Sequence, residues 1–233
     1  MAVSKPSSCD CAYNANSVLS LLACKLDLWL YRRPFEGGRA RRYTSIHRRG
    51  FGDLDRRLIC SWDRELGAAR TVLDLGSGPG SFARCLTAVH PHLTVIALEP
   101  SAALAGARPV RHGVRARAEA LPIADSVIDV AVCLSSIRHV HDRHHALYEL
   151  RRVVASAGAA YIVELDPSSD HRRIRNHSSA TRSWLNRLTF GPLLVKTAPR
   201  PETIAAIARC AGWTRIAVHT DPLQPLYIMR LSQ

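Results

Sequence analysis

A glycine-rich turn directly after a short apolar run constrains the fold of this chain more than any other feature. The run is Thr71 to Leu75, and the turn that follows it, residues 76–80, reads GSGPG. A short apolar run bounded by glycines is typical of a buried strand, and residues 81–89 then show helical spacing. Glycines let the backbone approach a ligand closely, and the helix start offers unpaired N–H groups to a negative group. The sequence therefore predicts a strand–turn–helix unit that binds an anionic group.

Strand and helix patterns alternate from this unit to the end of the chain. Further strands are predicted at 93–98, 115–118, 127–134, 159–165, 213–219 and 226–231. Helices are predicted at 17–31, 53–66, 81–89, 101–107, 146–154 and 201–211. The alternation favours βαβ units and an α/β fold with a mostly parallel, seven-stranded sheet. Residues 221–225 are too few for a helical crossover, so the last two strands should pair antiparallel.

Three further patterns follow the glycine turn at the ends of later strands. Glu99 closes the second strand, 23 residues after Gly76. Residues 118–123 read AEALPI after the third strand, and residues 129–136 read DVAVCLSS through the fourth strand and its exit. Ligands of open α/β sheets bind outside the carboxyl ends of the strands. These patterns should therefore line one site together with the glycine turn.

The combined pattern resembles a known family. With Asp74 the turn reads D-x-G-x-G-x-G, whereas a dinucleotide-binding turn would need glycine at Ser81. Together with the three later patterns, this motif resembles the class I S-adenosylmethionine-dependent methyltransferases, in particular small bacterial members whose adenine loop reads roughly A-E-x-L-P-F. The resemblance covers residues 70–165 by motif and the remainder by element order. It implies a Rossmann-like doubly wound sheet, the cofactor S-adenosylmethionine and methyltransferase activity.

The resemblance also assigns roles around the cofactor. Backbone N–H groups of residues 76–80 suit its carboxylate, and Asp74 can accept a hydrogen bond from its ammonium group. Glu99 would accept from both ribose hydroxyls, and Glu119 with the next N–H would hold adenine. The candidate cofactor-binding residues are Asp74, Gly76, Ser77, Gly78, Gly80, Glu99, Pro100, Glu119, Ala120, Leu134 and Ser135.

A histidine-rich segment, IRHVHDRHH at residues 137–145, follows the fourth strand. The family often has two histidines ahead of the valine, and here the first is replaced by Arg138 while His139 remains. A histidine that titrates near neutral pH suits a general base or a substrate-orienting group, so His139 is the candidate catalytic residue. A purely structural role at this loop-to-helix junction stays open. We expect no metal site, since family metal sites use mainly carboxylate and amide oxygens.

Of the net charge of +13, all but the +1 of residues 201–233 lies in two segments. Residues 32–70 hold eleven bases and five acids, and residues 167–200 hold seven bases and one acid, so each segment carries +6. Residues 71–166 hold nine of each and sum to zero. In the family these flanking segments usually form the substrate lid, which predicts arginines that clamp a phosphate, phosphonate or carboxylate. The candidate substrate-binding residues are Tyr43, Arg138, Arg173 and Arg182.

Three functions remain open from the sequence. The first is methyl transfer to a small, acidic metabolite or natural product, at oxygen rather than nitrogen. The second is methylation of RNA or DNA, with the basic flanks as an electrostatic track. No Asn/Asp-Pro-Pro-Tyr/Phe motif follows the fourth strand, and aromatic residues are only 6% of the chain, few for base stacking. The third is a protein that binds S-adenosylmethionine without transferring methyl.

Composition suggests a location and an organisation. The seven cysteines are odd in number and mostly widely spaced, which suits reduced thiols in a cytosol. No apolar stretch approaches the ~18 residues of a membrane span, so we expect a cytoplasmic monomer or homodimer with no membrane partner. Residues 1–68 should form an N-terminal arm and helical lid. Residues 69–233 should form the cofactor-binding core, with 166–200 as a substrate-cap insertion.

Overall fold

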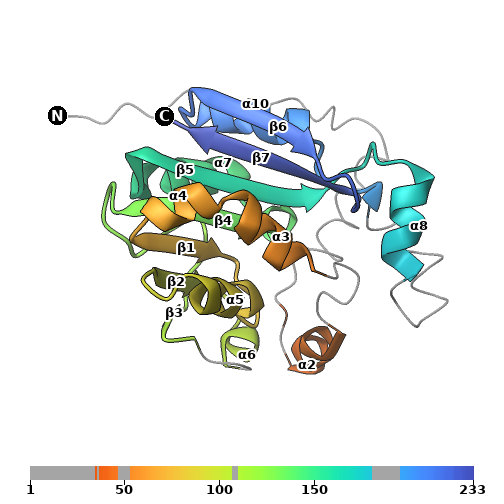
Figure 1. The fold of residues 1–233 in the computed structure, drawn as a ribbon, viewed down its shortest axis with the longest axis horizontal. Helices are drawn as coiled ribbons and strands as arrows, with labels where there is room; N and C mark the ends of the chain where they lie inside the picture. The colour runs from red at the N-terminus through yellow and green to blue at the C-terminus, as the bar shows by residue number, and fades with distance from the viewer. Residues whose placement is uncertain (1–34, 36, 47–52, 107–109, 180–194) are drawn as a thin grey trace. The chain divides into compact units, whose positions relative to one another are not determined.

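The computed structural model describes residues 35, 37–46, 53–106, 110–179 and 195–233. The strands within these ranges are β1 (Thr71–Leu75), β2 (Thr94–Leu98), β3 (His112–Val114), β4 (Ile128–Leu134), β5 (Val154–Leu165), β6 (Arg215–Thr220) and β7 (Leu226–Ser232). They form one seven-stranded sheet in the order β3-β2-β1-β4-β5-β7-β6 (Figure 1). Strands β1 to β5 pair in parallel, whereas β7 runs antiparallel to both β5 and β6. The predicted sheet, with its antiparallel end, is confirmed.

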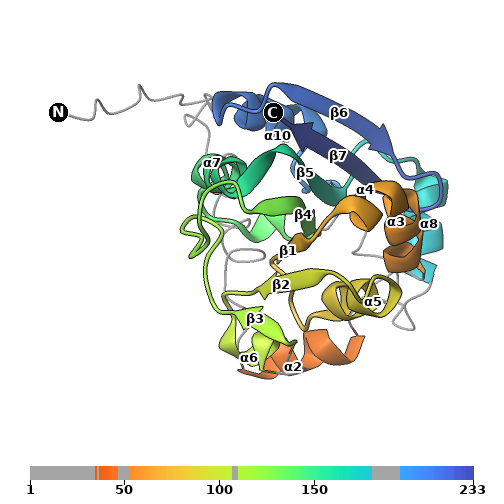
Figure 2. The same cartoon turned by 60° about the vertical axis from the view of Figure 1, so that its left-hand side comes forward.

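Helices cover both faces of this sheet. On one face lie α3 (Leu54–Ser61), α4 (Asp63–Ala68) and α5 (Ser81–Val89), and on the other lie α7 (Arg143–Val153) and α10 (Pro201–Cys210), as Figures 1 and 2 show. Successive strand residues point to opposite faces, so Val72 packs in one apolar layer and Leu73 in the other. The core therefore consists of two apolar layers, as expected for a doubly wound sheet.

Short elements gather at the carboxyl ends of the parallel strands. Helix α6 (Ala102–Ala105) follows β2, the 3₁₀ helix η2 (Ile137–His139) follows β4, and α8 (His171–Ser179) follows β5. Helix α2 (Gly37–Ile46) packs against α6. In Figure 1, α8 lies beyond the arrowhead of β5. These elements surround the sheet edge at which the sequence predicts the ligand site.

Two predicted elements are wrong in position or continuity. The strand predicted at 115–118 is β3 at His112–Val114, because the backbone pairs Ile96 with His112 and Glu99 N–H donates to Val114 O (3.0 Å). The helix predicted at 53–66 is divided at Trp62, whose ring stacks on Tyr161 of β5 at a centroid distance of 4.2 Å. The helix predicted at 17–31 lies outside the described residues.

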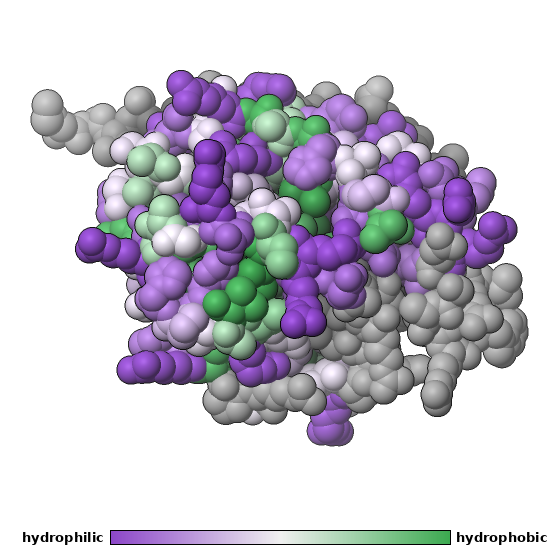
Figure 3. Space-filling view, viewed as in Figure 1, coloured by the Kyte–Doolittle hydropathy of each residue, from purple (hydrophilic) through white to green (hydrophobic). Residues whose placement is uncertain are grey.

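The surface seen in Figure 3 is mostly hydrophilic, and apolar residues appear there as separate patches rather than one continuous area. Within the described part of the chain, no helix combines the length and the apolar character needed to cross a membrane. Both findings agree with the alternating pattern of the sequence, which reserves apolar residues for the two layers beside the sheet.

Candidate functional site

The glycine turn after β1 adopts a backbone that only glycine takes easily. The φ angles of Gly76, Gly78 and Gly80 are 71°, 55° and 71°, in the left-handed region. Gly76 N–H donates to Leu98 O at the end of β2 (2.8 Å), and a Cβ on Gly76 would lie 2.5 Å from Ser136 Oγ. The turn is thus held between the ends of β2 and β4, with no room for a side chain at position 76.

Glu99 is attached to this turn by its carboxylate. It is only 7% exposed; its Oε2 accepts from Gly78 N–H and its Oε1 accepts from Ser101 N–H, both at 2.9 Å. Backbone N–H donors favour the ionised form of a buried carboxylate. Each carboxylate oxygen has a second lone pair, so Glu99 can still accept from hydroxyl groups of a ligand. Pro100, the next residue, is exposed at the same strand end.

Asp74 lies at the other side of the turn, near the end of the central strand. It is 1% exposed and is flanked in the sheet by Ala97 of β2 and Val132 of β4. A carboxylate in this position, beside the N–H groups of the turn, suits the cationic part of a zwitterionic ligand. The glycine turn and Asp74 thus lie side by side at the carboxyl end of β1.

The segment leaving β4 is fixed to both neighbouring strands. Ser135, after the buried Leu134, has a φ of 53° and donates its N–H to Val163 O of β5 (2.7 Å). Ser136 Oγ donates to Leu75 O of β1 (2.9 Å) and lies 3.0 Å from Cys133 Sγ. Burial raises the pKa of the Cys133 thiol to about 12, so this thiol stays protonated at neutral pH.

Glu119 joins two loops of the site. Its Oε1 accepts from the N–H groups of His141 and Asp142, at 3.0 and 3.2 Å. Ala120, beside it, is exposed and donates its N–H to Arg117 O (3.2 Å). Glu119 therefore connects the loop after β3 with the segment after η2. Its predicted contact with adenine is not tested by this geometry and stays a prediction.

Three aromatic rings gather over the glycine turn. The rings of Phe35 and His139 meet edge to face, 5.3 Å apart at 80°, and those of Phe35 and Tyr43 lie 4.7 Å apart. Tyr43 Cε1 lies 3.8 Å from the point that a Cβ on Gly78 would occupy. The structure thus brings together Tyr43 and His139, both named from the sequence. Phe35 was missed, because its Pro-Phe-Glu-Gly-Gly context signals only the end of a helix.

Two of the predicted arginines, Arg138 and Arg173, lie within the described residues. Arg138 is 5% exposed, and its Nε donates to Oε1 of the fully buried Glu164 (3.0 Å). Arg173 donates from Nε to Asp170 Oδ2 (3.0 Å) and from Nη1 to Asp221 O (3.1 Å). Arg182 lies outside the described residues. Arg138 and Arg173 thus each contact oxygens of the protein itself.

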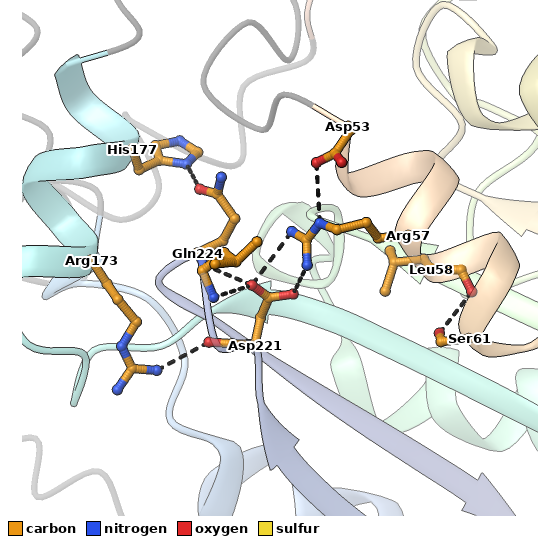
Figure 4. Close-up of polar contacts among 9 residues, drawn as sticks. Asp53, Arg57, Leu58, Ser61, Arg173, His177, Asp221 and Gln224 are labelled. Carbon is orange, nitrogen blue, oxygen red and sulfur yellow. Dashed lines mark hydrogen bonds and ion pairs between the residues drawn. The ribbon is translucent and has the colours of Figure 1, made fainter.

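Arg173 belongs to a polar network that Figure 4 shows in close-up. Arg57 of α3 donates from Nη1 to Asp221 Oδ2 (2.8 Å), and His177 Nδ1 of α8 lies 2.6 Å from Gln224 Oε1. Burial raises the pKa of Asp221, but hydrogen bonds from Arg57 and from backbone N–H groups outweigh it and hold the pKa below its ordinary value. Burial lowers the pKa of His177. The network joins α3, α8 and the β6–β7 turn.

Among the described residues, no three His, Cys, Asp or Glu side chains are arranged to hold a metal ion. Within the turn, the N–H groups of Gly76 and Ser77 donate to Leu98 O, that of Gly78 donates to Glu99 and that of Gly80 donates to Ser77 O. The site therefore offers a glycine backbone that a ligand can approach closely, two buried carboxylates beside it and a wall of rings. This arrangement can bind a ligand that carries an ammonium group and hydroxyls. Next to the wall it can position a second, reacting molecule.

Comparisons with known proteins relate this chain to methyltransferases. Residues 73–162 match the family model for a methyltransferase domain. An uncharacterised methyltransferase of Mycobacterium sp. (strain KMS) is 34% identical over 113 residues, which are 46% of this chain and 45% of that protein. The demethylmenaquinone methyltransferase of Thermotoga maritima is 32% identical over 105 residues, which are 43% of this chain and 46% of that protein. The chain therefore spans about half the length of these relatives.

A solved structure shows the same fold over nearly the whole chain. It is a candidate S-adenosylmethionine-dependent methyltransferase of Methanococcus maripaludis, with a TM-score of 0.69 and 17% identity. The match covers 86% of this chain and 94% of that chain. Because the sequence identity is only 17%, this similarity shows a common fold and nothing about function.

Proposed function

We propose that this chain transfers the methyl group of S-adenosylmethionine to a small molecule. The premise is that the chain is a class I S-adenosylmethionine-dependent methyltransferase by its domain and fold. The observation that carries the proposal is the glycine turn of residues 76–80 with Glu99 bonded to it. A glycine turn after the first strand and an acid at the end of the second strand form the arrangement that binds ribose-containing cofactors in open α/β sheets.

The proposed donor contacts follow from this geometry. The glycine turn of residues 76–80 lets the amino-acid part of the cofactor approach the backbone closely, and Asp74 binds its ammonium group. Glu99 accepts from the ribose hydroxyls, and the loop at Glu119 and Ala120 holds adenine. Leu134 and Ser135 lie beside the methyl group, at the exit of β4. The cofactor supplies a methyl group already activated on a sulfonium, so the protein has to align the acceptor and exclude water.

The proposed acceptor is a small molecule with a phosphate, phosphonate or carboxylate, methylated at oxygen. We assign to His139, whose ring lies edge to face with that of Phe35, the role of accepting the proton of an acceptor hydroxyl. The charge of +6 on residues 167–200 favours an anionic acceptor. Because Arg138 and Arg173 contact Glu164 and Asp170, Arg182 is the remaining candidate for the clamp.

The wider organisation is part of the same proposal. Residues 1–68 serve as arm and lid, residues 69–233 as the core, and residues 166–200 as the cap over the acceptor. The network of Figure 4 supports the cap assignment, because it fixes α8 to α3 and to the β6–β7 turn. We place the protein in the cytoplasm, as a monomer or homodimer.

Isothermal titration with S-adenosylmethionine tests the donor site in Gly78→Val and Glu99→Ala. Gly78 has a φ of 55° and lies beside Tyr43, so valine should abolish binding. Glu99→Ala removes hydrogen bonds to a charged group, each worth about 1.5–3 kcal/mol, and should weaken binding roughly 10- to 100-fold. Ser61→Ala, on the exposed side of α3, is the matched control. Unchanged binding in both variants would refute the donor site.

The two basic flanks favour a second candidate, a nucleic-acid methyltransferase. A filter-binding assay with RNA of mixed sequence distinguishes it from the first. Retention that falls steeply between about 50 and 200 mM salt would favour RNA as the acceptor. No retention at physiological salt favours the small molecule. Binding of the cofactor without methylation of any acceptor would support the third candidate, a non-transferring protein.

A further inference from the structure

Phe35 contacts residues that follow two different strands of the sheet, β2 and β4. Its carbonyl accepts from Ser101 Oγ at 2.5 Å, just after β2, and its ring meets the ring of His139, just after β4. In the sheet β1 lies between β2 and β4. A residue that contacts both of these ends must therefore pass over the end of β1, where the glycine turn lies.

Helix α2 continues this crossing. Tyr43 of α2 packs on the ring of Phe35 (4.7 Å) and approaches Gly78 from above (3.8 Å to its Cβ position). The helix itself packs on α6, which follows β2. We call residue 35 with residues 37–46 the strap. The strap touches the glycine turn, the exit of β2 and the exit of β4.

Ser101 connects the strap to the strand-end acid. It is 2% exposed; its N–H donates to Glu99 Oε1, and its Oγ accepts from Leu104 N–H (3.2 Å) while donating to Phe35 O. The other oxygen of Glu99 accepts from Gly78 N–H. Hydrogen bonds thus run without interruption from Gly78 through Glu99 and Ser101 to Phe35. The acid proposed for the ribose is only two hydrogen bonds from the strap.

We propose that Phe35 closes the donor site and forms the wall against which the acceptor binds, and that Ser101 is the positioning residue that holds Phe35 relative to Glu99. This inference rests on the proposed function. A donor that contacts Glu99 and the turn stabilises the arrangement in which Ser101 holds Phe35. Because such coupling is reciprocal, a closed strap must in turn retain the donor. Donor binding therefore completes the acceptor wall.

Stopped-flow displacement of S-adenosylhomocysteine tests the proposal without a known acceptor. Phe35→Ala and Ser101→Ala should each speed dissociation about fivefold or more, the effect of losing one net interaction. The double variant should be no faster than the faster single variant, because both open the same strap. Phe35→Leu keeps an apolar side chain of similar reach and should restore most of the retention. The control Ser61→Ala should match the unmodified protein.

Hydrogen exchange separates positioning from a local structural effect. With S-adenosylhomocysteine bound, amides of residues 37–46 should gain protection in the unmodified protein and lose that gain in Ser101→Ala. If Ser101 served only to cap α6, protection would change at residues 102–106 alone, which would overturn the proposal. Dissociation rates within twofold of the unmodified protein in both single variants would overturn it too. Failure of the unmodified protein to bind S-adenosylhomocysteine would instead refute the proposed function.

Discussion

Two regions border the same site, the ends of β1 and β2 and the ends of β4 and β5, and a different kind of interaction stabilises each of them. At the ends of β1 and β2 the backbone provides most of the stabilising contacts, through three left-handed glycines and the N–H groups that donate to Glu99. At the ends of β4 and β5 side-chain pairing dominates, with Arg138 of η2, just after β4, paired to Glu164 of β5. The first region depends on conformation, the second on charge compensation. Substitutions should therefore lower stability or binding for different physical reasons in the two regions.

The largest effect on folding stability is expected from Arg138→Met, at the ends of β4 and β5. Glu164 is fully buried, so losing its partner leaves an uncompensated carboxylate and should cost about 3–5 kcal/mol of unfolding free energy. The double variant Arg138→Met/Glu164→Leu should recover much of this loss. Urea denaturation measures both. A cost below about 1 kcal/mol for the single variant would contradict the charge-compensation account.

Gly76→Ala should have the next largest effect, at the ends of β1 and β2. Its Cβ would lie 2.5 Å from Ser136 Oγ, and its φ is 71°, so we expect a loss of about 2 kcal/mol or more and no binding of S-adenosylmethionine. Gly67→Ala is the control, because a Cβ there meets nothing within 4 Å in α4. That variant should be as stable as the parent or up to about 1 kcal/mol more stable. Equal behaviour of the two variants would contradict the conformational account.

The smallest effect on folding stability is expected from Asp221→Asn, in the polar network of Figure 4 that joins α3, α8 and the β6–β7 turn. Losing the charged hydrogen bond from Arg57 should cost about 1–2 kcal/mol at neutral pH. The pKa of Asp221 is lowered in the folded state, so its contribution is present above the unfolded pKa near ~4 and is lost as pH falls through the folded value. As the pH falls into the acidic range, the free energy of unfolding should therefore decrease less in the variant than in the unmodified protein. Identical acid-denaturation curves would contradict this linkage.

The same difference explains what could be predicted from the sequence. The strand at Thr71–Leu75, its glycine turn and Glu99 were placed correctly, since a buried strand and a left-handed turn leave local patterns. Phe35 could not be found, because its partner Ser101 is 66 residues away and nothing local marks a carbonyl as an acceptor. Glu164, the partner of Arg138, and Asp221, whose carbonyl accepts from Arg173, were hidden in the same way, because they lie 26 and 48 residues away. A surplus of arginine does not reveal which arginines the protein neutralises itself.

The place of β7 in the sheet has a consequence for synthesis. Residues 226–232 come last among the strands in sequence, yet they lie between β5 and β6. While the chain emerges from the ribosome, β5 has no neighbour on that side until these residues appear. Non-local pairings of this kind form slowly and leave strand edges open to other chains. The pairing of β5 and β6 with β7 therefore waits until residues 226–232 have been made, whereas the glycine turn and Glu99 can meet much earlier.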